Sequence, residues 1–181
     1  MERSRLVFSG SGGQGVITAA IILAKAAAIF ENKNAIQSQS YGAAARGGAT
    51  RTDIIISDSE INFPKVVQPN ILVSLTQESY NKFSPIIRPG GLLLVDSKYV
   101  TIAKKVDAKH VALPMFDTVM EKIGKPIVFN ICMLGALIGI SELIKPASIL
   151  KVLETTIPED FMDMNKKALD MGMKMGREAK S

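Results

Sequence analysis

The sequence predicts an α/β fold of three layers (α/β/α), with helices on both faces of a mixed, largely parallel sheet and a helical C-terminal third. Two observations support this prediction. Short β-rich segments alternate with helical segments over the first two thirds of the 181 residues, which is typical of βαβ units. Residues 92–97 form a continuous apolar run, as in a strand buried on both faces. The length suits one domain, residues 1–181.

The N-terminal part predicts a Rossmann-like βαβ unit. Residues 5–9 are rich in β-formers, residues 16–30 form an apolar helical segment, and residues 35–39 predict a second strand. We expect a right-handed crossover between these strands. Residues 50–57 predict a third strand, and residues 61–63 are expected to pair back on it as a hairpin, which would make the sheet mixed.

The later elements are predicted from apolar runs that glycine and proline interrupt. We expect further strands at residues 70–75, 92–97 and 111–113. We expect helices at residues 77–84, 117–123, 127–144, 146–155 and 159–180. Pro158 or Asp160 is a suitable cap for the last helix.

The composition is that of a folded protein with an aliphatic core, because 47% of the residues are hydrophobic and tryptophan is absent. The net charge is +5, but the basic residues are dispersed, which indicates a solvated surface and not a nucleic-acid site. The residues before the first strand are too few and too polar for a signal core, so we expect no signal peptide. Asn130 and Glu142 interrupt the apolar run 127–144, so we expect a buried helix, no membrane span and a cytoplasmic protein.

The single cysteine and single histidine exclude several kinds of site. Cys132 can form no disulfide within the chain and cannot alone hold an iron–sulfur cluster, which normally takes four cysteines. We expect it to be a core residue. His110 is the only histidine, which excludes a His-rich metal site, and we interpret it as a strand-edge residue. Asp96 closes a predicted strand at the edge where α/β folds bind ligands, so it is a further candidate contact.

A glycine-rich loop joins the first strand to the first helix. Gly10, Gly12 and Gly15 match G-x-G-x-x-G, and Gly13 and Gln14 lie within the same loop. Such a loop lets backbone N–H groups and a helix N-terminus approach a phosphate. The acidic residue that a dinucleotide site has after its second strand is missing, which argues against NAD or FAD. A phosphate or pyrophosphate contact and simple tight packing remain alternatives.

A second loop, between the second and third strands, is rich in small residues. Arg46, followed by Gly47, can hold a carboxylate or phosphate with its fork of donors. Tyr41, after Ser40, can stack on a flat ring or pack against another chain. A ligand site and a subunit interface are equally consistent with this loop.

The two loops together resemble those of the gamma subunit, or gamma domain, of 2-oxoacid:ferredoxin oxidoreductases. That family has G-x-G-G-Q-G-V where this chain has residues 10–16, and Q-S-Y-G-x-x-x-R-G-G where it has residues 39–48. The resemblance continues at residues 61–64, 89–91 and 130–136. Residues 43–45 are alanines where the family often has Pro-Glu, so a carboxylate is missing there. The Ser-Tyr-Gly form is similar to the 2-oxoglutarate and 2-ketoisovalerate types.

The resemblance implies a fold like domain III of pyruvate:ferredoxin oxidoreductase and one part of a multi-subunit enzyme. That enzyme converts a 2-oxoacid and coenzyme A (CoA) to acyl-CoA and CO2 and reduces ferredoxin. Thiamine diphosphate and iron–sulfur clusters are then expected on partner alpha and beta subunits, with a ferredoxin-like delta subunit as a further candidate partner. The isolated chain is expected to be inactive, and a homodimer is a candidate state for it.

The resemblance further implies that this chain contributes assembly contacts and part of the CoA site. No residue of this chain is expected to be catalytic or to bind metal. The expected cofactor-binding residues are Gly12, Gly13, Gln14, Gly15, Ser40, Tyr41, Arg46 and Gly47. The alternatives are a free-standing nucleotide-binding protein of Rossmann type and a purely structural subunit without a ligand.

Overall fold

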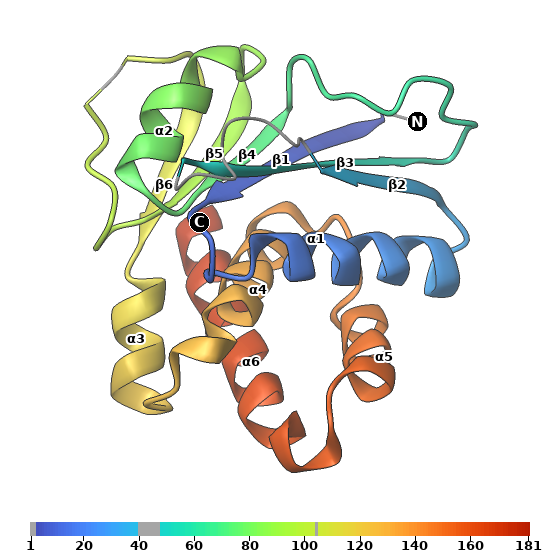
Figure 1. Ribbon diagram of the computed structural model, residues 1–181, viewed down its shortest axis with the longest axis vertical. Helices are drawn as coiled ribbons and strands as arrows, with labels where there is room; N and C mark the ends of the chain where they lie inside the picture. The colour runs from blue at the N-terminus through green and yellow to red at the C-terminus, as the bar shows by residue number, and fades with distance from the viewer. Residues whose placement is uncertain (1–2, 40–47, 104) are drawn as a thin grey trace.

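The computed structural model describes residues 3–39, 48–103 and 105–181, which form one sheet with helices on both faces (Figure 1). The sheet has six strands in the order β2-β3-β1-β4-β5-β6. The strands are β1 (Ser4–Gly10), β2 (Asn34–Gln39), β3 (Thr50–Ser57), β4 (Ile71–Ser74), β5 (Gly91–Asp96) and β6 (Ala108–Leu113).

Strands β1, β4, β5 and β6 are parallel, so the sheet is largely parallel as predicted. Strand β3 is antiparallel to both of its neighbours, β1 and β2. Strand β2 therefore runs in the same direction as β1, but β3 lies between them. The expected N-terminal βαβ unit is present in the form β1, α1, β2, with a later strand inserted into it.

The predicted hairpin between residues 50–57 and 61–63 is wrong. Both edges of β3 are already paired, one with β1 and the other with β2, so no backbone edge is left for a fourth partner. Residues 61–63 are irregular, and Ile61 packs on the apolar cluster beneath them. The sheet is mixed because β3 is inserted antiparallel and not because of a hairpin at residues 61–63.

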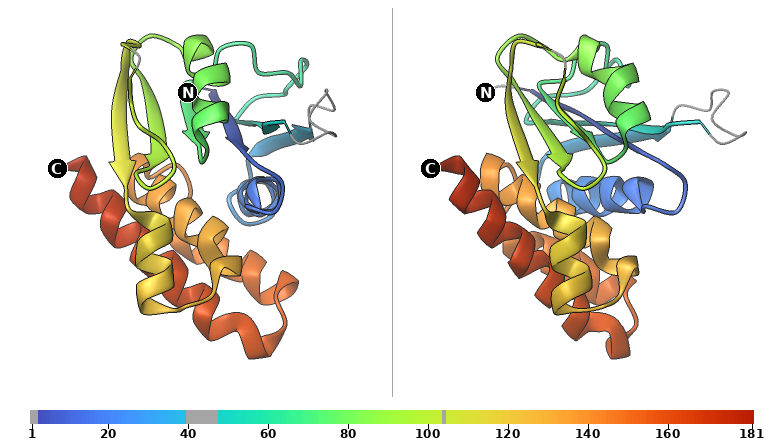
Figure 2. Two further views of the ribbon diagram at one scale, coloured as in Figure 1. Left: turned by 60° about the vertical axis from the view of Figure 1, so that its left-hand side comes forward. Right: turned by 90° about the vertical axis from the view of Figure 1, so that its left-hand side faces the viewer.

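The two helical layers are unequal (Figures 1 and 2). Helix α2 (Gln77–Phe83) and a 3-10 turn (Ser84–Ile86) cover one face. The other face carries the remaining helices. These are α1 (Val16–Lys25) with a π-helical extension (Ala26–Phe30), α3 (Met115–Lys122), α4 (Phe129–Ser141), α5 (Pro146–Thr156) and α6 (Met162–Lys180), with 3-10 turns at Pro126–Val128 and Glu159–Phe161.

Helix α4 is buried on nearly all sides, as expected for the apolar run 127–144. The run ends earlier than predicted, because Glu142 takes the left-handed conformation (φ 52°) after Ser141. Its N-terminal residues form a 3-10 turn. The last helical segment begins at Glu159, as predicted, with a 3-10 turn whose N-cap position is Pro158, and α6 follows from Met162; neither has a side-chain cap, and Asp160 lies inside the turn.

Candidate functional site

The glycine loop leaves the carboxyl end of β1 and enters α1. Gly13 (φ 86°) and Gly15 (φ 76°) both lie in the left-handed region, which favours glycine over every other residue type. Gly15 is the residue just before α1 and supplies no side chain to cap the helix. The predicted junction of strand, glycine loop and helix is therefore present.

Gln14 braces this loop from within. Its Oε1 accepts a hydrogen bond from the Ser11 amide (2.8 Å) and its Nε2 donates to the Leu75 carbonyl oxygen (3.1 Å). A Cβ on Gly10 would overlap Gln14 Oε1, so the glycine there makes room for the brace. The side chain of Gln14 thus holds the loop against the end of β4, and both of its polar groups are engaged within the chain.

The backbone amides of Gly12 and Gly13 point to no acceptor among the described residues. The first turn of α1 has no acidic residue, and no side chain caps it. Its first N–H groups therefore donate to no capping side chain. Unpaired N–H groups and the positive end of the helix dipole at one place favour an anion. Tight packing accounts for the glycines at positions 10 and 15, where a Cβ would overlap Gln14 and Asn130, but not for Gly12 or Gly13, where a Cβ would meet no atom within 4 Å.

Asn130, near the start of α4, lies against Gly15. Its Nδ2 donates to the Gly15 carbonyl oxygen (3.2 Å), and a Cβ on Gly15 would lie 2.6 Å from that nitrogen. The side chain is buried, and its Oδ1 has no hydrogen-bond partner among the described residues. A buried acceptor without a donor is costly, so this oxygen is a polar atom that the described part of the chain leaves unsatisfied. The sequence marked Asn130 as a polar interruption of an apolar run and as part of a family motif, but not as a neighbour of the glycine loop.

An apolar cavity of about 390 Å³ adjoins Asn130 and the first turns of α1. Two large apolar side chains at its rim are well exposed, Ile127 at 75% and Phe161 at 50%. Sequence reasoning missed this cavity, because its walls come from segments far apart in the chain. They are Thr18, Ile22, Ile127, Val128, Asn130, Ile131, Ile157, Pro158, Phe161, Met164 and Asn165.

The strand ends that flank the second predicted loop are described, but most of the loop is not. Ser40, Tyr41, Arg46 and Gly47 lie outside the described residues. The strands that flank them are described: Gln39 pairs with Thr52 at the end of β2. Gly10, where the glycine loop begins, pairs with Thr50, where β3 begins. The structure therefore brings the start of one loop next to the end of the other, although 40 positions separate Gly10 from Thr50.

Asp96 has a structural part in the fold. It is fully buried, and its carboxylate accepts hydrogen bonds from the amides of Lys98 (2.9 Å) and Phe116 (2.8 Å), the latter in the first turn of α3. Burial raises the pKa of this carboxyl, and the two amide donors oppose the rise. Both of its oxygens are engaged within the chain, which makes it the anchor of α3 and a poor ligand contact.

Cys132 and His110 fit their predicted places. Cys132 is buried in α4, and burial raises the pKa of its thiol to about 12, so it is no nucleophile at neutral pH. His110 lies on the edge strand β6. Within the described parts of the chain, no three acidic, cysteine or histidine side chains are grouped to hold a metal ion. Nor is any helix in these parts long and apolar enough to cross a membrane.

The fold and the glycine loop define an α/β domain of Rossmann-like construction whose first helix begins directly after a glycine loop at the end of β1. A family model for pyruvate ferredoxin/flavodoxin oxidoreductase matches residues 5–175. The chain therefore belongs to this family.

Individual relatives agree with this assignment. The 2-oxoglutarate synthase subunit KorC of Methanocaldococcus jannaschii is 41% identical over 97% of this chain and 95% of that protein. The gamma subunit of a keto/oxoacid ferredoxin oxidoreductase from Geobacter sulfurreducens has the same fold, with a TM-score of 0.92, 38% identity and full coverage of both chains.

A larger protein contains the same fold as one part. The 2-oxoglutarate:ferredoxin oxidoreductase of Magnetococcus marinus, solved with 2-oxoglutarate, CoA and succinyl-CoA bound, matches 98% of this chain with 32% of its own, at a TM-score of 0.85 and 19% identity. The resemblance predicted from the two loops is confirmed. The family comparison also confirms the expected function, a gamma subunit of a 2-oxoacid:ferredoxin oxidoreductase.

Proposed function

We propose that this chain acts as one domain that supplies part of the CoA site and the assembly contacts of a 2-oxoglutarate-type oxidoreductase. The observation that carries the CoA assignment is the pair of unpaired amides, Gly12 and Gly13, at an uncapped helix N-terminus. CoA carries a pyrophosphate and a 3′-phosphate, which are the anions that such a terminus binds. The 2-oxoglutarate type is proposed because the KorC relative is similar over nearly its whole length.

The second loop is proposed to complete the phosphate contacts. Arg46 is its only charged residue, and a guanidinium holds phosphate oxygens through two parallel hydrogen bonds. The pairing of Gly10 with Thr50 places the ends of both loops at one edge of the sheet. A ligand between the two loops would therefore receive backbone donors from one and a cation from the other.

The apolar cavity beside Asn130 is proposed to take the pantetheine arm of CoA. The arm alternates methylene groups with two amides, and the cavity has mostly apolar walls with Asn130 among its lining residues. A shift of the Asn130 side chain would expose its Oδ1, which has no partner among the described residues, to an N–H of the arm. When bound, CoA supplies the thiol that accepts the acyl group, and the residues of this chain bind and orient it.

The reaction's other cofactors are assigned to partner subunits. The chain has one cysteine, and that cysteine is buried, so it cannot supply the ligands of an iron–sulfur cluster. Thiamine diphosphate is assigned to a partner by the family resemblance. We propose alpha and beta subunits as these partners, with a ferredoxin-like delta subunit as a third.

The test is the CoA dependence of the reconstituted complex, with viologen reduction as the readout. Arg46→Ala is expected to raise the KM for CoA about tenfold, because a charge-assisted phosphate contact is lost, and to leave the KM for 2-oxoglutarate unchanged. Lys109→Ala removes the same charge from an exposed position on β6 and should change neither constant.

Two results would count against these assignments. An intact complex with an unchanged KM for CoA would make the loop scaffolding and this chain a purely structural subunit. Equal turnover of pyruvate and 2-oxoglutarate by the complex would contradict the proposed substrate type.

A further inference from the structure

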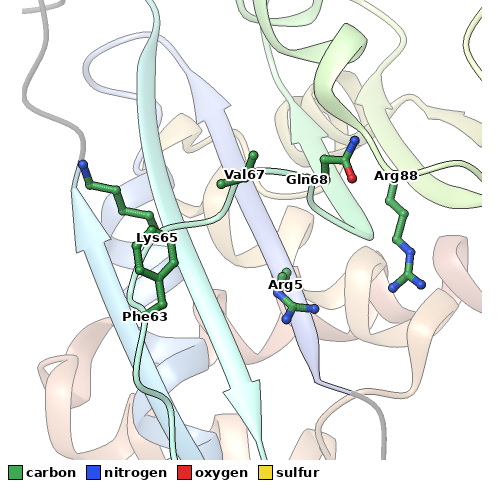
Figure 3. Close-up of a pocket in the computed structure, with 6 residues that line it drawn as sticks. All are labelled: Arg5, Phe63, Lys65, Val67, Gln68 and Arg88. Carbon is green, nitrogen blue, oxygen red and sulfur yellow. The ribbon is translucent and has the colours of Figure 1, made fainter.

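A basic hollow of about 410 Å³ lies at the amino end of the parallel strands, the end opposite to the glycine loop (Figure 3). Arg5 is near the start of β1, and Arg88 lies shortly before β5. The other lining residues belong to the segment that leads from β3 to β4. The full lining is Arg5, Phe63, Lys65, Val67, Gln68 and Arg88. The hollow therefore shares no residue with the candidate CoA site.

Every charged residue that lines this hollow is basic. Three of the six lining residues are cationic and none is acidic. Neither Arg5 nor Lys65 forms a side-chain hydrogen bond or ion pair with another described residue. Figure 3 shows the guanidinium groups of Arg5 and Arg88 pointing the same way, while the ammonium group of Lys65 points elsewhere. The cations are spread across the surface and do not converge on one point.

The backbone beneath the hollow is fixed. The Arg5 amide donates to Asn70 Oδ1 (2.6 Å), and the Asn70 amide donates back to the Arg5 carbonyl oxygen (2.9 Å). The Arg88 amide donates to the Pro69 carbonyl oxygen (2.8 Å). Both arginines are therefore presented from backbone that is already ordered, so that binding would cost little loss of backbone freedom.

The segment between Phe63 and Val67 is held in the same way. Val66 is buried, its amide donates to Asp53 Oδ2 (3.0 Å), and its carbonyl oxygen accepts from Arg51 Nη2 (2.6 Å). While Val66 is buried, two nearby apolar side chains of the same segment face outward: Phe63 is 58% exposed and Val67 is 69% exposed. Exposed apolar side chains beside arginines are the usual composition of a protein–protein interface.

We propose that this surface docks an acidic segment of a partner subunit, one with carboxylates spaced along the chain and apolar side chains between them. The spread of the cations suits several carboxylates better than a single phosphate, and arginine forks match carboxylates. Phe63 and Val67 would cover the apolar side chains of that segment. The proposal rests on the family assignment of the chain as a subunit and not on its CoA contact.

The test uses the full chain and its co-expressed partner subunits, with association measured at low and at high salt. Arg5→Glu and Lys65→Glu are each expected to weaken association about tenfold at low salt, mainly through a slower association rate, and to reduce its salt dependence. Lys109→Glu is the matched charge reversal. Lys109 is exposed on the edge strand β6, away from the hollow, so this variant should change association less than twofold. The KM for CoA should be unchanged in complex that has formed, which separates this test from that of the CoA site.

Val67→Asp is the second variant, in case a reversal at Arg5 disturbs the start of β1. Val67 is well exposed, so the variant should fold and still weaken association. If Arg5→Glu, Lys65→Glu and Val67→Asp all left association unchanged, the proposal would be overturned. Binding of inorganic phosphate or ATP that depends on Arg5 and leaves assembly untouched would also overturn it, because the hollow would then be a small-anion site.

Discussion

At the scale of single residues, the structure shows the role of Gln14, the glutamine of the glycine-loop motif. Gln14 connects the Ser11 amide to the Leu75 carbonyl oxygen, so one side chain joins the loop to a neighbouring strand. A motif of this kind specifies loop shape as much as ligand contact. We therefore expect variation at Gln14 to act on stability first and on CoA binding through the shape of the loop.

Gln14→Met tests this role, since methionine has nearly the same length and neither hydrogen-bonding group. We expect the free energy of unfolding to fall by about 1–2 kcal/mol, because two hydrogen bonds are lost and the Leu75 carbonyl oxygen is left with fewer donors. Urea titration measures the change. Gln68→Met, at an exposed glutamine, should stay within about 0.5 kcal/mol of the parent chain. Equal stability of the two variants would show that the brace contributes nothing.

Cys132 provides a pH-dependent prediction. Burial raises the pKa of its thiol from 9.0 to about 12 in the folded state, so the folded chain keeps the proton at pH values where the unfolded chain loses it. The stability that this group contributes is present below about pH 9 and is lost as the pH rises towards 12. At pH 8 the native thiol should resist Ellman's reagent and react fully in guanidinium. Rapid labelling of the native chain would contradict the buried position.

At the scale of elements, the contact between α4 and α6 depends on four glycines. Gly135 and Gly139 on α4 face Gly172 and Gly176 on α6, and a Cβ at any of them would overlap backbone of the opposite helix. The two helices therefore pack backbone to backbone, as Figure 2 shows for α6 running along α4. The sequence predicted both helices, but glycine in a helix is otherwise a destabilising residue and gave no sign of this contact.

Gly172→Ala should separate the two helices, because the new methyl group would overlap the Cys132 carbonyl oxygen within a rigid backbone contact. We expect a loss of about 3 kcal/mol or more in the free energy of unfolding, measured by urea or thermal unfolding. Gly12→Ala is the matched control, since a Cβ there meets no atom within 4 Å. A Gly172→Ala variant as stable as this control would show that the helices can shift apart at little cost.

At the scale of the whole molecule, two opposite ends of one sheet carry two kinds of surface. The carboxyl end of β1 leads into the glycine loop and lies beside the start of β3, whereas its amino end contributes Arg5 to the basic hollow. A subunit with a ligand site at one end and a docking surface at the other can hold CoA and its partners at the same time. Three of the 22 basic residues, Arg5, Lys65 and Arg88, lie far apart in the sequence and line that hollow together in the fold.

The sequence by itself determined the element types, the three-layer α/β class and the family, because hydrophobic periodicity and glycine motifs are local signals. The tertiary structure alone decided how β3 is inserted beside β1, and thereby that residues 61–63 form no strand. It also decided that Asn130 contacts Gly15 and that Arg5 and Lys65 line one hollow. Each of these depends on contacts between distant residues, which backbone pairing and close packing select only when the whole chain has folded.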